Sequence, residues 1–202
     1  MTNDTSGSGL TKKKNANNTE KWSPRIVELE REKWQDYRLE FRYTSNNYYD
    51  VGIDHTGDGF NVIFNKRPYD TPFYKEPDDT DKLFQLWWND VKAWGIIENK
   101  RLVAVIETAV EEWSNRLIVT EIWIDDAYRR QGIATFLMDV AMKRAREEKC
   151  RAMILETQSC NEGAIAFYLD YGFSLIGFDA CAYENNDLER KEVRMNFGIY
   201  LE

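Results

Sequence analysis

The stretch from residue 117 to residue 148 constrains the fold most, because its hydrophobic periodicity changes once along its length. It reads LIVTEIWIDDAYRRQGIATFLMDVAMKRAREE. Its first part, up to Ile124, consists mainly of β-favouring residues and predicts a strand. From Ile133 onward the apolar residues recur at helical spacing. The stretch therefore predicts a strand, a short loop and a helix in direct succession.

The loop between this strand and this helix, residues 128–134, has the properties of a phosphate-binding loop. Free backbone N–H groups and the positive end of the helix macrodipole lie where a chain enters a helix. Gly132 lets the backbone approach an anion closely, Ala134 keeps the first turn open, and Arg129 and Arg130 add positive charge. The loop is neither a Walker loop nor a GxGxxG turn. An ordinary strand–helix corner with a solvated arginine pair is the alternative.

The length and composition of the chain predict one folded domain preceded by a tail. The 202 residues include seven Trp, eleven Tyr and ten Phe, which suffice for a substantial core. Residues 1–21 are rich in Asn, Ser, Gly, Thr and Lys and are predicted to be a disordered tail. The folded domain is predicted to span residues 22–202.

Composition also argues against several classes of function. No apolar run approaches the roughly 18 residues of a membrane span, and the N-terminus lacks the apolar segment of a signal peptide. Cys150, Cys160 and Cys181 are odd in number and lack metal-ligand spacing, which favours a reducing cytoplasm. The net charge of −8 argues against general nucleic-acid binding and is compatible with a cationic small substrate. We therefore expect a cytoplasmic protein with no metal, nucleic-acid or membrane partner.

The pattern before the central stretch predicts strands and one long loop. Strands are expected at residues 25–30 and 37–43, and a hairpin at residues 48–64 with its turn at residues 56–59. Residues 67–81 are rich in Pro, Asp and Tyr and are expected to form a loop, followed by a short helix at 81–88. A second hairpin is expected from the apolar runs at 94–97 and 102–106.

The pattern after the central stretch alternates strands with one more helix. Strands are expected at residues 153–157, 173–177 and 193–200, and a helix at 161–171. This order of elements predicts a mixed α/β sheet with helices packed on its faces.

Two motifs in the second half of the chain resemble those of one enzyme superfamily. The form Arg129-x-x-Gly132-x-Ala134 resembles the acyl-CoA pyrophosphate loop of the GNAT acetyltransferases, usually written Q/R-x-x-G-x-G/A. The run from Asn161 to Phe173, NEGAIAFYLDYGF, resembles their pattern N-x-x-A-x-x-F/L-Y-x-x-x-G-F. Both the order and the spacing of the motifs match that superfamily.

The resemblance implies a fold and a co-substrate. The implied fold is a single GNAT-like domain of the α/β class, with a mixed, mostly antiparallel sheet, a central splay and helices on both faces. The implied co-substrate is acetyl-CoA, held by the end of the central strand, the loop and the second helix. The residues that match are Ile122, Trp123, Ile124, Arg129, Arg130, Gln131, Gly132, Ile133, Ala134, Thr135, Asn161, Ala164, Phe167 and Tyr168.

The resemblance also implies roles in the chemistry. An amine that attacks a thioester produces a tetrahedral oxyanion, which then expels a thiolate. Tyr168 matches the tyrosine that gives this thiolate a proton, and the alternative is a core aromatic. Asn161 matches an asparagine that contacts the pantetheine arm, and the alternative is a helix cap.

A closer resemblance is to the streptothricin N-acetyltransferases. It rests on Leu155-Glu156-Thr157-Gln158 and on the pattern of residues 172–179, with a weaker likeness near residues 58–60, 68–69 and 112–115. Such enzymes acetylate an amine of the β-lysine arm of streptothricin, a basic antibiotic. Arg130 and Gln131 depart from the pattern, because a glycine and a basic residue are usual there.

A carboxylate is expected to accept the ammonium proton. The one histidine, His55, falls near the predicted hairpin turn and is an improbable base. Glu121 lies on the central strand, beside the implied splay, where it could take the proton through water or hold the ammonium. A solvent-facing strand residue is the alternative for Glu121. Glu156, on the next strand, is a second candidate.

Acidic and aromatic residues could form an entrance for a cationic acceptor. Trp113, Glu121 and Glu156 are the expected acceptor-binding residues. The other residues that could contribute are Glu76, Asp78, Asp79, Asp81, Trp87 and Trp88. A solvated acidic loop is the alternative for residues 76–81.

We expect acetyl transfer from acetyl-CoA to a primary amine of a basic small molecule, with streptothricin as the acceptor and antibiotic resistance as the result. Acetylation of a protein N-terminus or lysine, or of an aminoglycoside or polyamine, are the alternatives. A catalytically inactive acyl-CoA-binding domain is a third, against which the intact loop and Tyr168 argue. The protein is expected to be a monomer or a homodimer.

Overall fold

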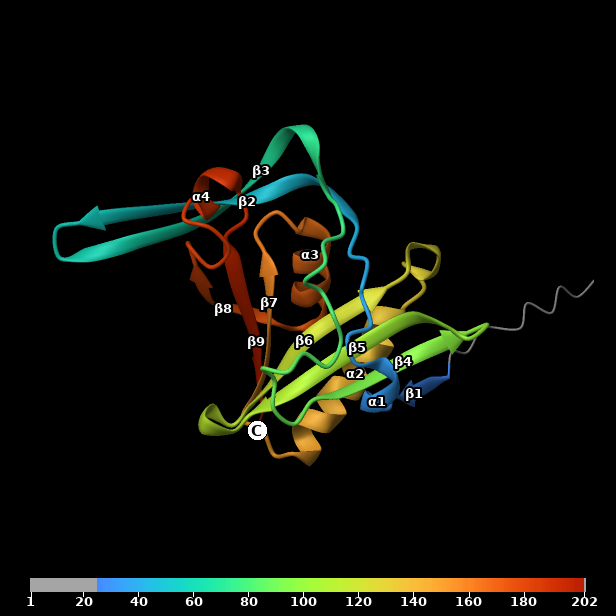
Figure 1. The fold of residues 1–202 in the computed structure, drawn as a ribbon. Coiled ribbons are helices and arrows are strands. Elements are labelled where there is room, and N and C mark those ends of the chain that lie inside the picture. The colour runs from blue at the N-terminus through green and yellow to red at the C-terminus, as the bar shows by residue number, and fades with distance from the viewer. Residues whose placement is uncertain (1–24, 202) are drawn as a thin grey trace, which may run out of the picture.

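The computed structural model describes residues 25–201, so the tail predicted at residues 1–21 lies outside the described residues. A seven-stranded sheet and a separate two-stranded hairpin form the framework of the fold (Figure 1). The strands are β1 (Ile26–Glu28), β2 (Tyr43–Thr56), β3 (Gly59–Lys75), β4 (Lys92–Glu98), β5 (Arg101–Glu111), β6 (Arg116–Ile124), β7 (Ala152–Gln158), β8 (Ser174–Asp179) and β9 (Arg194–Tyr200). The helices are α1 (Arg31–Trp34), α2 (Ile133–Glu147), α3 (Glu162–Tyr171) and α4 (Asp187–Arg190). Short 3-10 turns lie at Glu112–Ser114 and Asp126–Tyr128.

The large sheet has the strand order β1-β4-β5-β6-β7-β9-β8. Every neighbouring pair is antiparallel except β6 and β7, which are parallel. These two strands pair only at three positions, Arg116 to Ile118 with Ala152 to Ile154. Beyond that point β6 continues to Ile124 and β7 to Gln158, but these parts of the two strands do not pair with each other. The two central strands therefore diverge, as the predicted splay requires.

Helices cover both faces of this sheet. The amphipathic helix α2 buries Ile133, Leu137 and Met138 in one core, together with residues of α3 and the sheet. A second core on the opposite face contains Leu39, Leu83 and side chains of β5 and β6. In Figure 1, α1 lies on the side of the sheet that faces the viewer and α2 lies behind it. The predicted fold class is confirmed.

Three expectations for the first half of the chain are wrong. Residues 67–81 were expected to form a loop, but β3 continues to Lys75. A register shift opposite residues 69–72 accommodates Pro72, while Pro68 pairs with Asn47. Residues 37–42 form no strand, since only Arg38 makes a β-bridge, to Lys82. Apolar and charged residues alternate in this segment without forming a strand, and its Leu39 is fully buried in the second core. The short helix expected at 81–88 is replaced by turns.

The base of the β2–β3 hairpin is fixed to the start of α3. The carboxylate of Glu162 accepts hydrogen bonds from the backbone N–H groups of Asn46 and Asn47 and pairs with Lys66. The Tyr49 N–H donates to the carbonyl oxygen of Ser159 at 2.9 Å. From this attachment the rest of the hairpin projects away from the sheet (Figure 1).

A close approach of strands β4 and β5 requires glycine at position 95. A Cβ atom at Gly95 would lie 2.6 Å from Cδ1 of Leu102 and 3.0 Å from the carbonyl oxygen of Ala104. Gly95→Ala is therefore expected to lower the free energy of unfolding by about 1–3 kcal/mol, measured by urea denaturation. Gly52→Ala is the matched strand control, because no heavy atom lies within 4 Å of its Cβ position. Equal losses in the two variants would contradict this reading of the packing.

Candidate active site

A cavity of about 1120 Å³ opens where β6 and β7 diverge. Its floor is the unpaired part of the two strands, residues 119–124 of β6 and 155–158 of β7. Residues 41–43 and 75–81 form one wall, and residues 182–192 contribute to another. The start of α2 and the first turns of α3 complete the lining. The cavity thus brings together the two motifs that the sequence singled out.

A β-bulge in β6 turns Glu121 toward this cavity. Glu107 of β5 pairs with Glu121, whereas Thr108 pairs with Val119, so that Thr120 is an additional residue in β6. The bulge places Glu121 on the same face of the sheet as Glu107. Glu121 therefore lies beside the splay, where the sequence predicted it.

The loop before α2 forms a candidate anion site from backbone groups. Arg130 and Gly132 both have positive φ, 58° and 81°, which folds the loop tightly over the helix start. No side chain caps α2 among the described residues, and its first turn contains no acidic residue. The N–H groups of Ile133, Ala134 and Thr135 have no acceptor within the helix, because they belong to its first turn. These residues line the cavity, as predicted.

The side chain of Arg129 fixes the loop. It donates to the carbonyl oxygens of Ile124 at 3.0 Å and Arg42 at 2.7 Å, and it pairs with Asp126 at 2.9 Å. The amide of Gln131 turns back to the carbonyl oxygen of Ala127, and this residue does not line the cavity. Arg129 also lines the cavity, but its guanidinium is used within the protein, so Arg130 and the backbone remain as the groups of this loop that can bind an anion.

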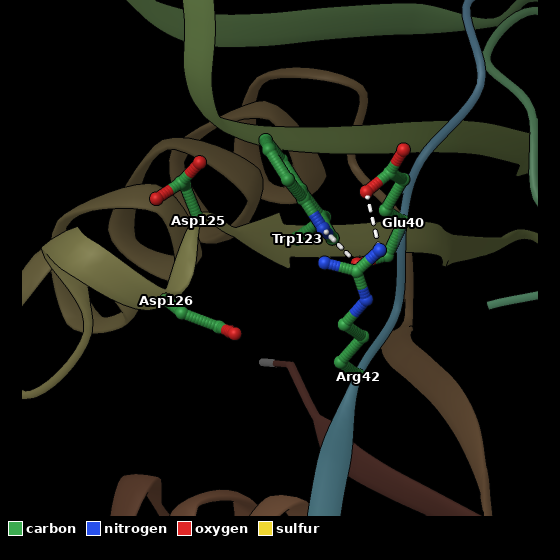
Figure 2. Close-up of a pocket in the computed structure, with 5 residues that line it drawn as sticks. All are labelled: Glu40, Arg42, Trp123, Asp125 and Asp126. Atoms are coloured by element: carbon green, nitrogen blue, oxygen red, sulfur yellow. Dashed lines mark hydrogen bonds and ion pairs between the residues drawn. The ribbon is translucent and has the colours of Figure 1, made fainter. Parts of the chain in front are cut away.

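A small pocket of about 170 Å³ lies beside the end of β6 (Figure 2). The indole N–H of Trp123 donates to the carbonyl oxygen of Glu40 at 3.0 Å, and Arg42 pairs with the Glu40 carboxylate. The Trp123 side chain packs in the second core. Only the backbone of Trp123 is therefore available to pair with a ligand at the free edge of β6. The predicted binding strand of Ile122, Trp123 and Ile124 lines the cavity.

Helix α3 contributes its first turns to the cavity. Asn161 caps the helix by accepting from the N–H of Ala164 at 3.2 Å, which is the alternative left open for this residue. Ala164, Phe167 and Tyr168 all line the cavity, and Tyr168 is 6% exposed. Burial raises the pKa of Tyr168, and the Glu121 carboxylate raises it further. The phenol is therefore protonated at neutral pH and can donate a proton.

The other end of the cavity is strongly acidic. Burial raises the pKa of Glu121 well above its ordinary value, and the neighbouring carboxylates of Asp81, Glu107, Glu156 and Asp78 raise it further. A carboxylate in such surroundings is a stronger base than one in water. It is also a favourable partner for a cation that enters the cavity.

The neighbouring carboxyl groups titrate differently. Burial raises the pKa of Asp81 to about 6, with a contribution from Asp78. Burial would also raise the pKa of Asp78, but hydrogen bonds from Thr80 and Lys75 hold it at about 2. Burial raises the pKa of Glu156, while its ion pair with Arg194, 3.2 Å long, opposes the shift.

Sequence and structure agree on part of the acceptor end. Glu121 and Glu156 line the cavity, and so do Asp78 and Asp81 of the predicted acidic loop. Trp113 does not: it is 83% exposed and its ring lies against the guanidinium of Arg116. Trp87, Trp88, Glu76 and Asp79 also lie outside the lining.

Several lining residues carried no motif in the sequence. They are Tyr43, Tyr183, Glu184 and Glu192. Glu107, which faces Glu121, had one visible signal: it is a single charge within the apolar run LVAVIETAV of β5. A charge in such a run indicates a buried polar contact.

A model of the acetyltransferase (GNAT) family matches residues 62–173, which is more than half of the chain. This chain belongs to the GNAT acetyltransferase family. It is an enzyme of acetyl transfer, as its two motifs predicted. The matched region contains the central strand, the loop, α2 and α3.

Named acetyltransferases resemble the chain in sequence and fold. It is 24% identical over 124 residues to streptothricin acetyltransferase A of Bacillus subtilis (strain 168), covering 60% of this chain and 70% of that protein. Its fold matches the crystal structure of nourseothricin acetyltransferase with a TM-score of 0.70 and 23% identity, over 88% of this chain and 98% of that one. A Bacillus anthracis str. Ames structure, assigned as a streptothricin acetyltransferase and complexed with acetyl coenzyme A, gives a TM-score of 0.67 and 20% identity over 90% and 100%.

Two further observations concern partners. None of the helices in residues 25–201 is long and apolar enough to cross a membrane. Within the same residues, no three potential ligand side chains gather so as to hold a metal ion.

The anion site at the start of α2 yields a test in this acetyltransferase. Gly132→Glu would place a carboxylate against the phosphate groups and is expected to weaken acetyl-CoA binding by roughly 100-fold, measured by calorimetry. Gln131→Glu adds the same charge one residue earlier, on a side chain that turns away from the cavity. It should change binding by less than about fivefold. Similar affinities for the two variants, with circular dichroism spectra unchanged, would contradict the assignment.

Proposed function

We propose that this acetyltransferase transfers the acetyl group of acetyl-CoA to a primary amine of a polycationic small molecule, with streptothricin as its acceptor. The observation that carries the proposal is the group of carboxylates around Glu121, in the cavity where the cofactor loop and Tyr168 also meet. Acetylation would remove one positive charge from such an antibiotic, and the biological result would be resistance.

The cofactor end of the cavity suits acetyl-CoA. The pyrophosphate would accept hydrogen bonds from the N–H groups of the loop and of the first turn of α2, with Arg130 beside it. The amide-containing pantetheine arm would pair with the free edge of β6 at Ile122 to Ile124, as an added strand. The acetyl-CoA complex of the Bacillus anthracis protein supports the same choice of co-substrate for this fold.

The chemistry can be derived from two side chains. Glu121 accepts a proton from the acceptor ammonium, directly or through water, and the free amine attacks the thioester carbonyl carbon. The C–S bond of the tetrahedral adduct then breaks, and Tyr168 gives its phenolic proton to the departing sulfur. As the adduct collapses, the attacking nitrogen loses its second proton to solvent and becomes the amide nitrogen, and Tyr168 recovers a proton from solvent. The raised pKa makes Glu121 a stronger base, and it keeps the Tyr168 phenol protonated until the thiolate departs.

The acidic end favours an acceptor with several positive charges. Reaction neutralises only one amine, so the remaining ammonium groups need partners in the cavity. Glu156 pairs with Arg194, and Glu184 and Glu192 pair with Arg190, so Glu121 and Asp81 are the lining carboxyl groups that best suit these cations. A protein N-terminus with no further cation would use only one of them, which argues for the polycation over the protein acceptor.

The role of Tyr168 gives the first test of this function. Tyr168→Phe removes the proton donor and keeps the ring that packs against Phe173 and Phe197. The expected result is a 10- to 1000-fold lower kcat, with acetyl-CoA affinity nearly unchanged. Phe167→Leu, which alters a neighbouring lining residue without removing a hydroxyl, controls for packing. A kcat near that of the wild type in Tyr168→Phe would mean that water protonates the thiolate.

The acceptor gives the second test. Release of CoA thiol would be followed with streptothricin, an aminoglycoside, spermidine, a neutral amine and a peptide. Streptothricin should have the highest kcat/KM, and that value should fall with added salt. It should also rise with pH through the raised pKa of Glu121, because the base is active only when deprotonated.

Glu121→Gln separates the acceptor site from the cofactor site. It should reduce kcat/KM for streptothricin by roughly 100-fold and leave acetyl-CoA affinity within about twofold. Glu98→Gln, at the end of β4 and outside the cavity lining, is the control. A preference for the neutral amine, or no effect of salt, would overturn the choice of a polycation.

A further inference from the structure

Glu107 is a fully buried charged residue at the centre of the sheet. Its exposed fraction is 0%, and Val105, Ile106 and Ala109 of the same strand are also buried. In the strand register it lies between Ala93 of β4 and Glu121 of β6. A carboxylate at such a position is costly unless each oxygen finds a donor.

Both oxygens of Glu107 have donors, and the donors belong to different parts of the site. Oε2 accepts the backbone N–H of Phe84 at 2.5 Å. Oε1 accepts the hydroxyl of Thr120, the additional residue of the β6 bulge, at 2.9 Å. Arg31 of α1 donates to the Phe84 carbonyl oxygen and lies over the Phe84 ring, 5.8 Å from its centre. Glu107 therefore connects the bulge to the chain segment that follows the acidic wall.

We propose that Glu107 is a positioning residue for acetyl transfer, which fixes Glu121 at the splay and holds the segment that carries Asp78 and Asp81. The inference rests on the proposed function, since it concerns the same base and the same acceptor. Without the bond to Thr120, the bulge loses the contact that fixes its additional residue. Without the bond to Phe84, the segment that follows the acidic wall loses its hydrogen bond to β5 and is held there by the packing of Leu83 and Phe84 in the second core.

The charge of Glu107 has a second effect on Glu121. The groups that face Glu121 and Glu107 are Asp78 and Asp81 from the wall, Glu156 from β7, Tyr168 from α3 and Arg31 from α1. Arg31 is the one cation recorded as acting on Glu107 among the described residues, and Glu107 is one of four carboxylates that favour the protonated form of Glu121. Removing its charge should make Glu121 lose its proton at lower pH.

The experiment compares Glu107→Gln with Glu111→Gln in the full-length protein, with acetyl-CoA and streptothricin. Glutamine can still accept from Phe84 and can place its amide against Thr120, so the main loss is the charge. We expect kcat to fall roughly 10-fold, with acetyl-CoA affinity unchanged, and the acid limb of the kcat/KM profile to move to lower pH by about half a unit or more. Glu111 lies on the same strand but pairs with Arg116 away from the cavity, so its variant should keep the wild-type profile.

A second pair of variants tests the contact to the bulge without changing any charge. Thr120→Val removes the hydroxyl and should lower kcat by about 5- to 20-fold, whereas Thr120→Ser keeps the hydroxyl and should restore most of it. If Glu107→Gln fails to fold, the two Thr120 variants alone test the inference. Unchanged kcat in Thr120→Val, or an unmoved pH profile in folded Glu107→Gln, would overturn the inference. Failure of the wild type to acetylate any basic acceptor would instead refute the proposed function.

Discussion

The divergence of β6 and β7 after three residue pairs is the constraint on which the rest of the site depends. Two adjacent parallel strands normally satisfy each other's backbone groups, but here β6 and β7 leave their facing edges free over the second half of their lengths. A free edge inside a cavity can pair with the amide groups of an extended ligand. The same divergence makes room for side chains from α2, α3 and the walls to meet around that ligand.

Groups that suit anions and groups that suit cations lie in different parts of the cavity. The loop and the start of α2 offer N–H groups and Arg130, which suit phosphate, whereas Glu121 and its neighbours suit ammonium groups. The raised pKa of Glu121 follows from this crowding, because each neighbouring carboxylate disfavours a further negative charge. The cationic acceptor proposed above would relieve that repulsion when it binds, so substrate charge and site charge would be matched before the reaction begins.

The sequence predicted those parts of the site that depend on local structure. The loop at Gly132, the helix beginning at Asn161 and the central strand follow from short-range periodicity and backbone chemistry, and each is found where expected. Glu121 and Tyr168 were located with them. Their roles as base and proton donor stay predictions.

The parts that were missed depend on long-range pairing. Residues 67–75 were expected to be a loop because of Pro68 and Pro72, yet they pair with β2 across a register shift. Glu107 drew no attention because its partners, Phe84 and Thr120, are distant in sequence or follow a bulge. Trp113 was expected at the acceptor end because of its aromatic character, but it lies beside Arg116 at the start of β6.

The base of the β2–β3 hairpin holds together the two chain segments that form one wall of the cavity. Tyr43 and Lys75 are a residue pair at this base, and both line the cavity, one at the end of segment 41–43 and the other at the start of segment 75–81. Glu162 attaches the same base to the first turn of α3, next to Asn161. Because the two segments and the start of α3 share this attachment, a displacement of either segment is transmitted to the other and to the first turn of α3.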